Sequence, residues 1–133
     1  MIVERLRPEA SIEVTVTEGM QAAFGDEVIH PVYGTASMVG HMELAARQVI
    51  LPAREPHEEG IGHRVEVTHL APAPVGSRIT VTARLGTVNG NRVTCEVEAR
   101  TWHGVIGQGT ITQVILPREI LQRRFAEFGG ETK

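Results

Sequence analysis

Alternating apolar and polar residues predict strands in two parts of the chain. In Ser11–Thr17, three aliphatic residues share one face, and acidic or hydroxyl residues share the other, which is typical of a half-buried strand. The same alternation predicts strands over Gly62–Leu70, Arg78–Val88, Val93–Ala99 and Val105–Leu116. Asn89-Gly90 is a strong hairpin signal between two of these strands. Consecutive strands with short connections favour an antiparallel sheet.

Helical periodicity is strongest over Ala36–Leu51, and Pro52 ends this predicted helix. Its apolar positions fall on one side, as expected for a helix that lies on a sheet. They are Met38, Met42, Ala45, Ala46 and Val49, with Val39 and Ile50 at the margins. A short helix is predicted over Thr17–Phe24. A C-terminal helix is predicted over Pro117–Phe128, with Leu121, Phe125 and Phe128 on one stripe.

The element order is therefore a strand, a long helix and four further strands. The segment Pro52–Gly60 is rich in Pro, Glu and Gly, and we expect it to be an exposed loop. One long apolar helix with one sheet to cover predicts an α+β protein of the hotdog fold, an antiparallel sheet wrapped around a central helix. Other α+β connectivities stay open. The length of 133 residues suits a single domain over 1–133.

Composition indicates which binding partners and which cellular compartment are favoured. The net charge is −3 and aromatic residues are 4%, which disfavours nucleic acid and anionic membranes as partners. The one cysteine, Cys95, excludes a disulfide within the chain and fits a reducing compartment. Cys95 alternates in phase with buried positions, so we expect it to be inert. The N-terminus lacks the apolar run of a signal peptide, and no segment is long enough to span a membrane. We therefore expect a soluble cytoplasmic protein.

Glu43 lies at the edge of the apolar face of the long helix, where acidic residues are rarely buried without a partner. One interpretation is an exposed ion pair with Arg47, four residues later. The other is a half-buried carboxylate whose raised pKa would suit a general base. The sequence alone leaves both interpretations open.

Two more polar residues lie near one end of the same helix. His69 shares the inward face of its strand with Val65 and Val67, although a core histidine without a chemical role is the commoner case. Thr35 precedes the helix, where Thr often serves only as an N-cap, a role for which Ser37 competes. A hydroxyl there also lies among free backbone N–H groups that suit a developing oxyanion. Thr35, Glu43 and His69 would together supply an acyl-transfer site.

Other kinds of site find little support. His41 and Glu43 are two residues apart on a helix and face different directions. His63 and His69 are separated by roughly 20 Å of strand, too far to share a metal ion. The chain has no paired-cysteine zinc motif and no phosphate-binding or dinucleotide fingerprint. We therefore predict no metal.

Two segments carry a family resemblance. TASMVGHMELAA, residues 35–46, resembles the helix of the fluoroacetyl-CoA thioesterase-like branch of hotdog thioesterases, which shows Thr, Met-Val-Gly and Met-Glu at this spacing. VTHLAPAPVGSRITVTARL, residues 67–85, is similar to the strand of that branch that carries the catalytic His. The spacing from Glu43 to His69 matches, as does a Gly seven residues before the His. The resemblance covers about Ser11 to Leu116.

The resemblance implies a function and a set of site residues. Thr35, Glu43 and His69 match the catalytic residues of the family, and Gly62 matches a glycine whose N–H holds the thioester carbonyl. We add Tyr33 and Ser37, on either side of Thr35, as predicted substrate-binding residues. The implied reaction is hydrolysis of an acyl-CoA, with no cofactor except the coenzyme A of the substrate. The implied assembly is a homodimer, with a tetramer as a larger alternative and active sites near the subunit interface.

Two departures bear on specificity. The segment DEVIHPVY before Thr35 has only one aromatic residue where the fluoroacetyl-specific member has phenylalanines, and Ile111-Thr112-Gln113 replaces a frequent His-Glu-Arg. Both departures argue against fluoroacetyl specificity and favour a broader or different short-acyl specificity. The rival functions are a non-catalytic acyl-CoA-binding hotdog protein and a hotdog enoyl-CoA hydratase or dehydratase. The candidates for holding the CoA phosphates are Arg47, Arg54, Arg64 and Arg78.

Overall fold

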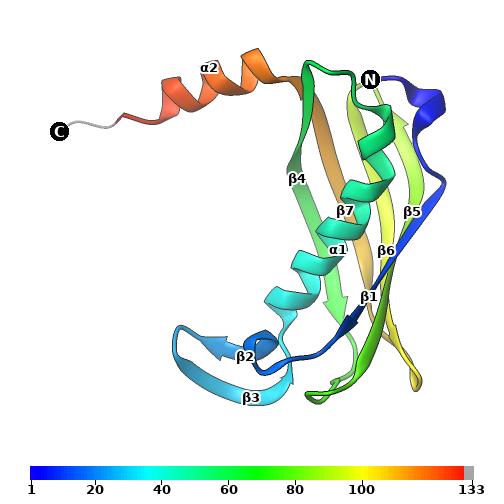
Figure 1. The fold of residues 1–133 in the computed structure, drawn as a ribbon, viewed down its shortest axis with the longest axis vertical. Coiled ribbons are helices and arrows are strands. Elements are labelled where there is room, and N and C mark those ends of the chain that lie inside the picture. The colour runs from blue at the N-terminus through cyan, green and yellow to red at the C-terminus, as the bar shows by residue number, and fades with distance from the viewer. Residues whose placement is uncertain (131–133) are drawn as a thin grey trace.

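A curved antiparallel sheet wraps around one long helix in the computed structural model, which describes residues 1–130 (Figure 1). The helix is α1 (Thr35–Ile50). The sheet strands are β1 (Glu9–Thr15), β4 (Glu58–His69), β5 (Arg78–Asn89), β6 (Arg92–Thr101) and β7 (Gly104–Pro117), in the spatial order β1-β5-β6-β7-β4. Every neighbouring pair is antiparallel. This confirms the predicted hotdog arrangement, and β4 forms one edge of the sheet.

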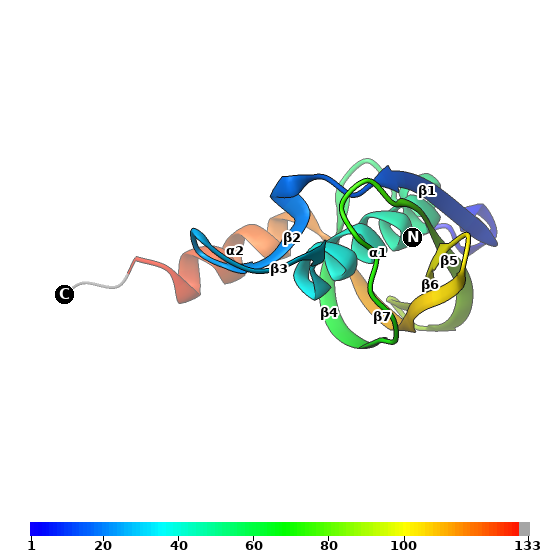
Figure 2. The ribbon, with the colours of Figure 1, turned by 90° about the horizontal axis from the view of Figure 1, so that it is seen from below.

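The core lies between α1 and the concave face of the sheet (Figure 2). The buried residues of α1 are those of the predicted apolar side: Met38, Met42, Ala45, Ala46, Val49 and Ile50. Cys95 is buried on β6, as expected, and burial raises the pKa of its thiol to about 11. A Cβ on Gly107 would overlap Met38, and one on Gly109 would overlap the backbone of Glu66. These two glycines therefore allow Met38 of α1 and the backbone of β4 to approach β7 closely.

The segment before α1 differs from the prediction. The predicted helix over Thr17–Phe24 is wrong beyond Met20, because only the short 3₁₀ helix η2 (Glu18–Met20) forms. The chain then makes a two-stranded hairpin of β2 (Gln21–Phe24) and β3 (Glu27–Tyr33). Gly25 adopts a φ of 62° at its turn, a left-handed conformation that favours glycine. The dipeptide Gly25-Asp26 was the available sequence signal for this turn.

The other end of the molecule also departs from expectation. β4 begins at Glu58, inside the segment predicted to be an exposed loop. Glu58 is buried there, and its carboxylate accepts a hydrogen bond of 2.8 Å from the amino group of Met1. Further 3₁₀ turns are η1 (Val3–Arg5) and η3 (Leu51–Ala53). Among residues 1–130, no helix has the length and apolar character to cross a membrane.

The C-terminal helix α2 (Arg118–Phe128) projects beyond β4, away from the rest of the molecule (Figures 1 and 2). Of its predicted apolar stripe, Leu121 is buried, whereas Phe125 and Phe128 are exposed. The prediction of this helix is therefore confirmed, and two of the three residues of its stripe are left uncovered by the described part of the chain.

Candidate functional site

Thr35 and His69 meet at the N-terminus of α1. Gly34 takes the N-cap position, so the Thr35 hydroxyl is not used to cap the helix. Instead, Thr35 Oγ1 is hydrogen-bonded to His69 Nδ1 at 2.8 Å. His69 ends β4 and pairs with Gly107 of β7. Val65 and Val67 pair with Ile111 and Gly109 on the same face, which confirms the predicted inward phase of His69.

The second ring nitrogen of His69 has no protein partner. Nε2 is buried and makes no hydrogen bond with the described residues. A buried polar nitrogen without a hydrogen-bond partner costs free energy. A substrate or water atom that forms a hydrogen bond with Nε2 would remove this cost and would therefore be stabilised there. When Nδ1 accepts the Thr35 proton, Nε2 carries a proton to donate, and in the opposite tautomer Nε2 is an acceptor. The pair of Thr35 and His69, here called the hydroxyl–imidazole pair, can therefore transfer a proton in either direction.

Tyr33 holds one side of the His69 ring. The two rings meet edge to face, with centroids 6.5 Å apart. Tyr33 is 1% exposed, and its hydroxyl bonds His41 Nδ1 at 2.5 Å with the two rings stacked. Burial raises the pKa of Tyr33 and lowers the pKa of His41, so a neutral phenol donates to a neutral imidazole. The Tyr33–His41 pair was not anticipated from the sequence, although Tyr33 was among the predicted substrate-binding residues.

Glu43 lies at a different point along α1. Its side chain is exposed, and a Cβ built on Gly62 would lie 3.1 Å from its Oε2. Arg47 does not pair with Glu43, because its guanidinium bonds Glu59 at 2.8 Å. The predicted ion pair is therefore wrong, and in the single chain the carboxylate is not half-buried either. Glu43 and Gly62 form what we call the carboxylate–glycine pair.

Within one chain the two pairs are separated. Thr35 and Glu43 are eight residues apart on α1, which corresponds to about 12 Å along the helix axis. Gly62 and His69 lie at separate points along β4, on either side of a bulge next to His63. The structure therefore brings Thr35 to His69 and Glu43 to Gly62, but it does not bring these two pairs into one cluster within the chain.

Two cavities adjoin the hydroxyl–imidazole pair. One, of about 340 Å³, is lined by Tyr33, Thr35 and His69 together with Leu70–Pro72. The other, of about 330 Å³, lies under the β2–β3 hairpin and is lined by Thr35, Ser37, Phe24 and Ile29. Ser37, a predicted substrate-binding residue, thus faces the second cavity beside Thr35.

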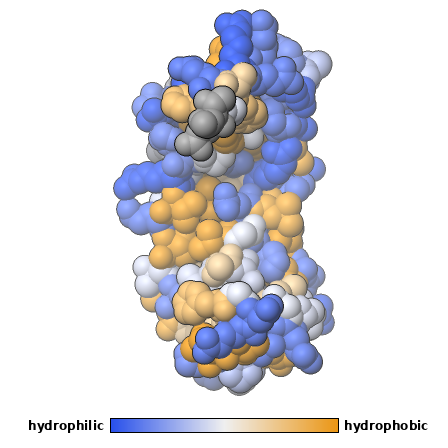
Figure 3. Space-filling view, turned by 90° about the vertical axis from the view of Figure 1, so that its left-hand side faces the viewer, coloured by the Kyte–Doolittle hydropathy of each residue, from blue (hydrophilic) through white to orange (hydrophobic). Residues whose placement is uncertain are grey.

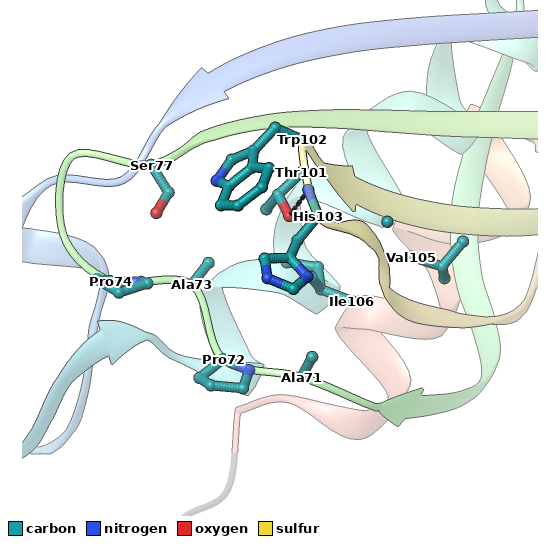
Figure 4. Close-up of a pocket in the computed structure, with 11 residues that line it drawn as sticks. Ala71, Pro72, Ala73, Pro74, Ser77, Thr101, Trp102, His103, Val105 and Ile106 are labelled. Carbon is teal, nitrogen blue, oxygen red and sulfur yellow. Dashed lines mark hydrogen bonds between the residues drawn. The ribbon is translucent and has the colours of Figure 1, made fainter.

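A larger groove of about 510 Å³ lies between Ala71–Pro74 and the β6–β7 turn, where Trp102 and His103 stand over it (Figure 4). It shares Ala71 and Pro72 with the cavity of Thr35 and His69. It contains none of the three predicted catalytic residues, so we do not assign the chemistry to it.

The four arginines considered for the CoA phosphates are all in ion pairs. Arg47 and Arg54 both bind Glu59, Arg64 binds Glu66, and Arg78 binds Glu13.

In the described part of the chain, one group of three residues has the spacing of metal ligands: Glu55, His57 and Glu58. Both of its carboxylates already bind the Met1 ammonium. This group lies near the start of β4, at the opposite end of that strand from His69.

Known proteins resemble this chain in both sequence and structure. A thioesterase of Streptantibioticus cattleyicolor, named fluoroacetyl-CoA thioesterase, is 39% identical over 88 residues, which are 66% of this chain and 63% of that protein. The chain thus spans less than two thirds of the length of that relative. A Thermus thermophilus hypothetical protein, described as a thioesterase superfamily member, is 49% identical with a TM-score of 0.83 over 90% of both chains.

Structures of the fluoroacetyl-CoA thioesterase FlK share the fold almost from end to end. One has a TM-score of 0.85 at 28% identity and covers 95% of this chain and 98% of its own. A mutant in complex with acetyl-CoA has a TM-score of 0.86 at 26% identity, over 95% and 99% of the two chains. The family profile described as FlK, fluoroacetyl-CoA-specific thioesterase, matches residues 16–119, which include every predicted catalytic residue. The chain therefore belongs to the FlK family of hotdog thioesterases.

Proposed function

We propose that this protein is an acyl-CoA thioesterase that hydrolyses a short acyl thioester to the free acid and coenzyme A. The observation that carries the proposal is the hydrogen bond between Thr35 and His69, which leaves His69 Nε2 buried and available beside a cavity. A relative that shares this fold has been seen with acetyl-CoA, which supports an acyl-CoA as the substrate. Coenzyme A is part of that substrate, and no other cofactor is proposed.

We propose that the active site is completed in a homodimer formed through β4. β4 is an edge strand of twelve residues, and such an edge offers unpaired backbone groups to another strand. Two large apolar side chains of β4 are exposed, Ile61 and Val65. Figure 3 looks at this side and shows an apolar region in its middle, below a largely polar upper end. An apolar surface beside a free strand edge suits a symmetric pairing with a second copy.

The same pairing brings the two halves of the site together. In an antiparallel pairing centred near Val65, Gly62 of one subunit lies close to His69 of the partner. Each dimer then has two sites, each with a hydroxyl–imidazole pair from one subunit and a carboxylate–glycine pair from the other. The pairing also covers the exposed Glu43 and so creates the desolvated carboxylate that a general base requires. This resolves the separation of the two pairs within one chain.

The proposed chemistry uses both pairs. Glu43 takes a proton from water as the water oxygen adds to the thioester carbonyl carbon. Alternatively, the Glu43 carboxylate attacks that carbon and displaces the thiolate, and water then hydrolyses the resulting mixed anhydride to the free acid. The developing oxyanion accepts a hydrogen bond from the Gly62 N–H, and loss of such a donor typically costs about 3 kcal/mol of barrier. The C–S bond then breaks as the tetrahedral intermediate collapses, and His69 Nε2 delivers a proton to the leaving thiolate while Thr35 holds Nδ1. The proton that Glu43 took from water passes through solvent to His69, which restores both groups.

The residues around the cavities bear on acyl specificity, and the cysteine content bears on the cellular compartment. Ile29 and Val32 line the cavities where the fluoroacetyl-specific member has phenylalanines, so we propose a short acyl group other than fluoroacetyl. We also propose a cytoplasmic location, which the single, buried and unpaired Cys95 supports.

Thiol release tests the function directly. Glu43→Gln and His69→Ala should each reduce hydrolysis of acetyl-CoA and other short acyl-CoAs by at least about 100-fold while leaving the fold intact by circular dichroism. Trp102→Ala is the control, because this exposed side chain lies outside the proposed site. Binding of acyl-CoA by calorimetry without thiol release would instead support a non-catalytic binding protein. Hydration of enoyl-CoA without thiol release would support a hydratase.

A further inference from the structure

The helix α2 has no partner for its apolar stripe within the chain. It has eleven residues, and an isolated helix of this length is marginal in water. Phe125 is 59% exposed and Phe128 is 74% exposed. The Arg124 guanidinium lies 5.2 Å from the centre of the Phe128 ring and has no carboxylate partner among residues 1–130, whereas Arg118 and Arg123 do. The free stripe of α2 is therefore aromatic and carries a positive charge.

The β2–β3 hairpin presents the complementary surface. Phe24 is 81% exposed, and Val28 and Ile29 are exposed beside it. Asp26 and Glu27 stand at the hairpin turn, and neither forms an ion pair in the described part of the chain. The hairpin also forms a wall of the cavity beside Thr35, through Phe24 and Ile29. A partner that covers this hairpin would therefore affect the shape of that cavity, which we call the acyl pocket.

The α2 helix and the hairpin of one chain lie at opposite ends of the molecule (Figure 1). α2 follows Pro117, which pairs with Glu58 at the start of β4. The hairpin leads into Thr35, which bonds His69 at the end of β4. A two-fold axis across β4 exchanges these ends, so it carries α2 of one subunit to the hairpin end of the other. Since α2 already projects past β4, it extends towards the partner (Figure 2).

We propose that α2 of each subunit packs on the β2–β3 hairpin of the partner and holds the wall of its acyl pocket in place. Phe125 and Phe128 would cover Phe24, Val28 and Ile29, and Arg124 would lie near Asp26 and Glu27. This inference rests on the proposed homodimer. It adds a specificity-determining contact from the partner that acts on the hairpin, without touching the reacting atoms.

The test measures dimer dissociation and acyl selectivity together. Phe125→Ser and Phe128→Ser should each raise the dimer dissociation constant by about 10- to 100-fold in sedimentation experiments, because each loses a buried aromatic contact. Discrimination between acetyl-CoA and octanoyl-CoA should fall by at least about 3-fold as the hairpin loosens. Trp102→Ser, which removes an even more exposed aromatic side chain at the β6–β7 turn, should change neither quantity.

A charge exchange identifies the partner surface. Arg124→Glu alone, and Asp26→Lys with Glu27→Lys, should each weaken the dimer by about 3-fold, and the combined variant should recover the wild-type dissociation constant. If the wild type is an active dimer and none of these variants alters its affinity or selectivity, the α2 contact is refuted and the proposed function stands. A wild-type protein that is monomeric and active would refute the dimer and this contact together.

Discussion

Substitution of Gly62 by Ala tests whether the position of Glu43 matters for catalysis. Gly62 has no positive φ, so the backbone accepts an L side chain without strain. The added methyl group would lie 3.1 Å from Glu43 Oε2, closer than an ordinary van der Waals contact by a few tenths of an ångström. Glu43 is exposed in the single chain, so its carboxylate can move away there at little cost in the stability of the fold. The Gly62 N–H is retained, so any loss of activity reports the displaced carboxylate.

The expected magnitudes separate activity from stability. Loss of glycine flexibility in the unfolded chain contributes about 0.4–1 kcal/mol in favour of the Ala variant, which offsets the small steric cost. The melting temperature should therefore change by no more than roughly 3 °C. A misplacement of a catalytic group by a fraction of an ångström to 1 Å can cost about 10- to 100-fold in rate, so kcat/KM should fall by that amount.

The matched control is Gly60→Ala, two residues earlier on β4. There a Cβ would overlap the Cδ1 atom of Ile50, which is fully buried and has little room to move. Overpacking of this kind costs about 1–3 kcal/mol, so the control should lose stability and keep its kcat/KM when folded. Thiol-release kinetics and thermal melts of both variants show whether each substitution changes activity or stability. Full activity in Gly62→Ala would refute the placement of Glu43 in the site.

Three further predictions concern other contacts. Thr35→Val should lower kcat/KM by about 10-fold, which corresponds to the loss of one hydrogen bond to His69, while the kcat/KM of Thr35→Ser should stay within about 3-fold of the wild-type value. A loss of about 10⁴-fold in Thr35→Val would instead indicate that Thr35 is the nucleophile. Gly109→Ala should lower the melting temperature by roughly 10 °C, because its Cβ would overlap the backbone of Glu66 and separate β4 from β7; an unchanged melt would contradict this packing. The hydrogen bond from Arg47 holds the pKa of Glu59 at about 2, below its usual 4.5, so the stability it contributes is present above pH 4.5 and lost as pH falls towards 2. Melting curves of Glu59→Gln should show a shallower acid dependence than the wild type.

Much of the fold could be predicted because it depends on local patterns. The alternation of Val93, Cys95 and Val97 and the period of Met38 and Met42 each determine one buried face, and the structure has those faces. The hairpin before α1 was missed because its strands are short and largely exposed, so burial imposes no alternation on them. Its signal was a turn dipeptide, Gly25-Asp26, rather than a hydrophobic pattern.

The site was harder to predict because it depends on contacts between distant segments. The inward phase of His69 followed from strand alternation, but its bond to Thr35 needs the register of β4 with β7. Glu43 was expected to be paired or half-buried, yet Glu59, brought close by the start of β4, takes Arg47 instead. No pattern in α1 shows which carboxylate its arginine will contact, since that choice is made by tertiary packing.

The central claim is that each site combines Glu43 of one subunit with Thr35 and His69 of the other, and mixing of inactive subunits tests it most directly. Glu43→Gln and His69→Ala subunits, refolded together in equal amounts, form about half heterodimers if they assort at random. In each heterodimer, one site carries both substitutions and the other carries neither. The account predicts recovery of about a quarter of wild-type thiol release in the mixture. Activity no greater than that of the two separate variants, with heterodimers demonstrated by mass spectrometry, would contradict it.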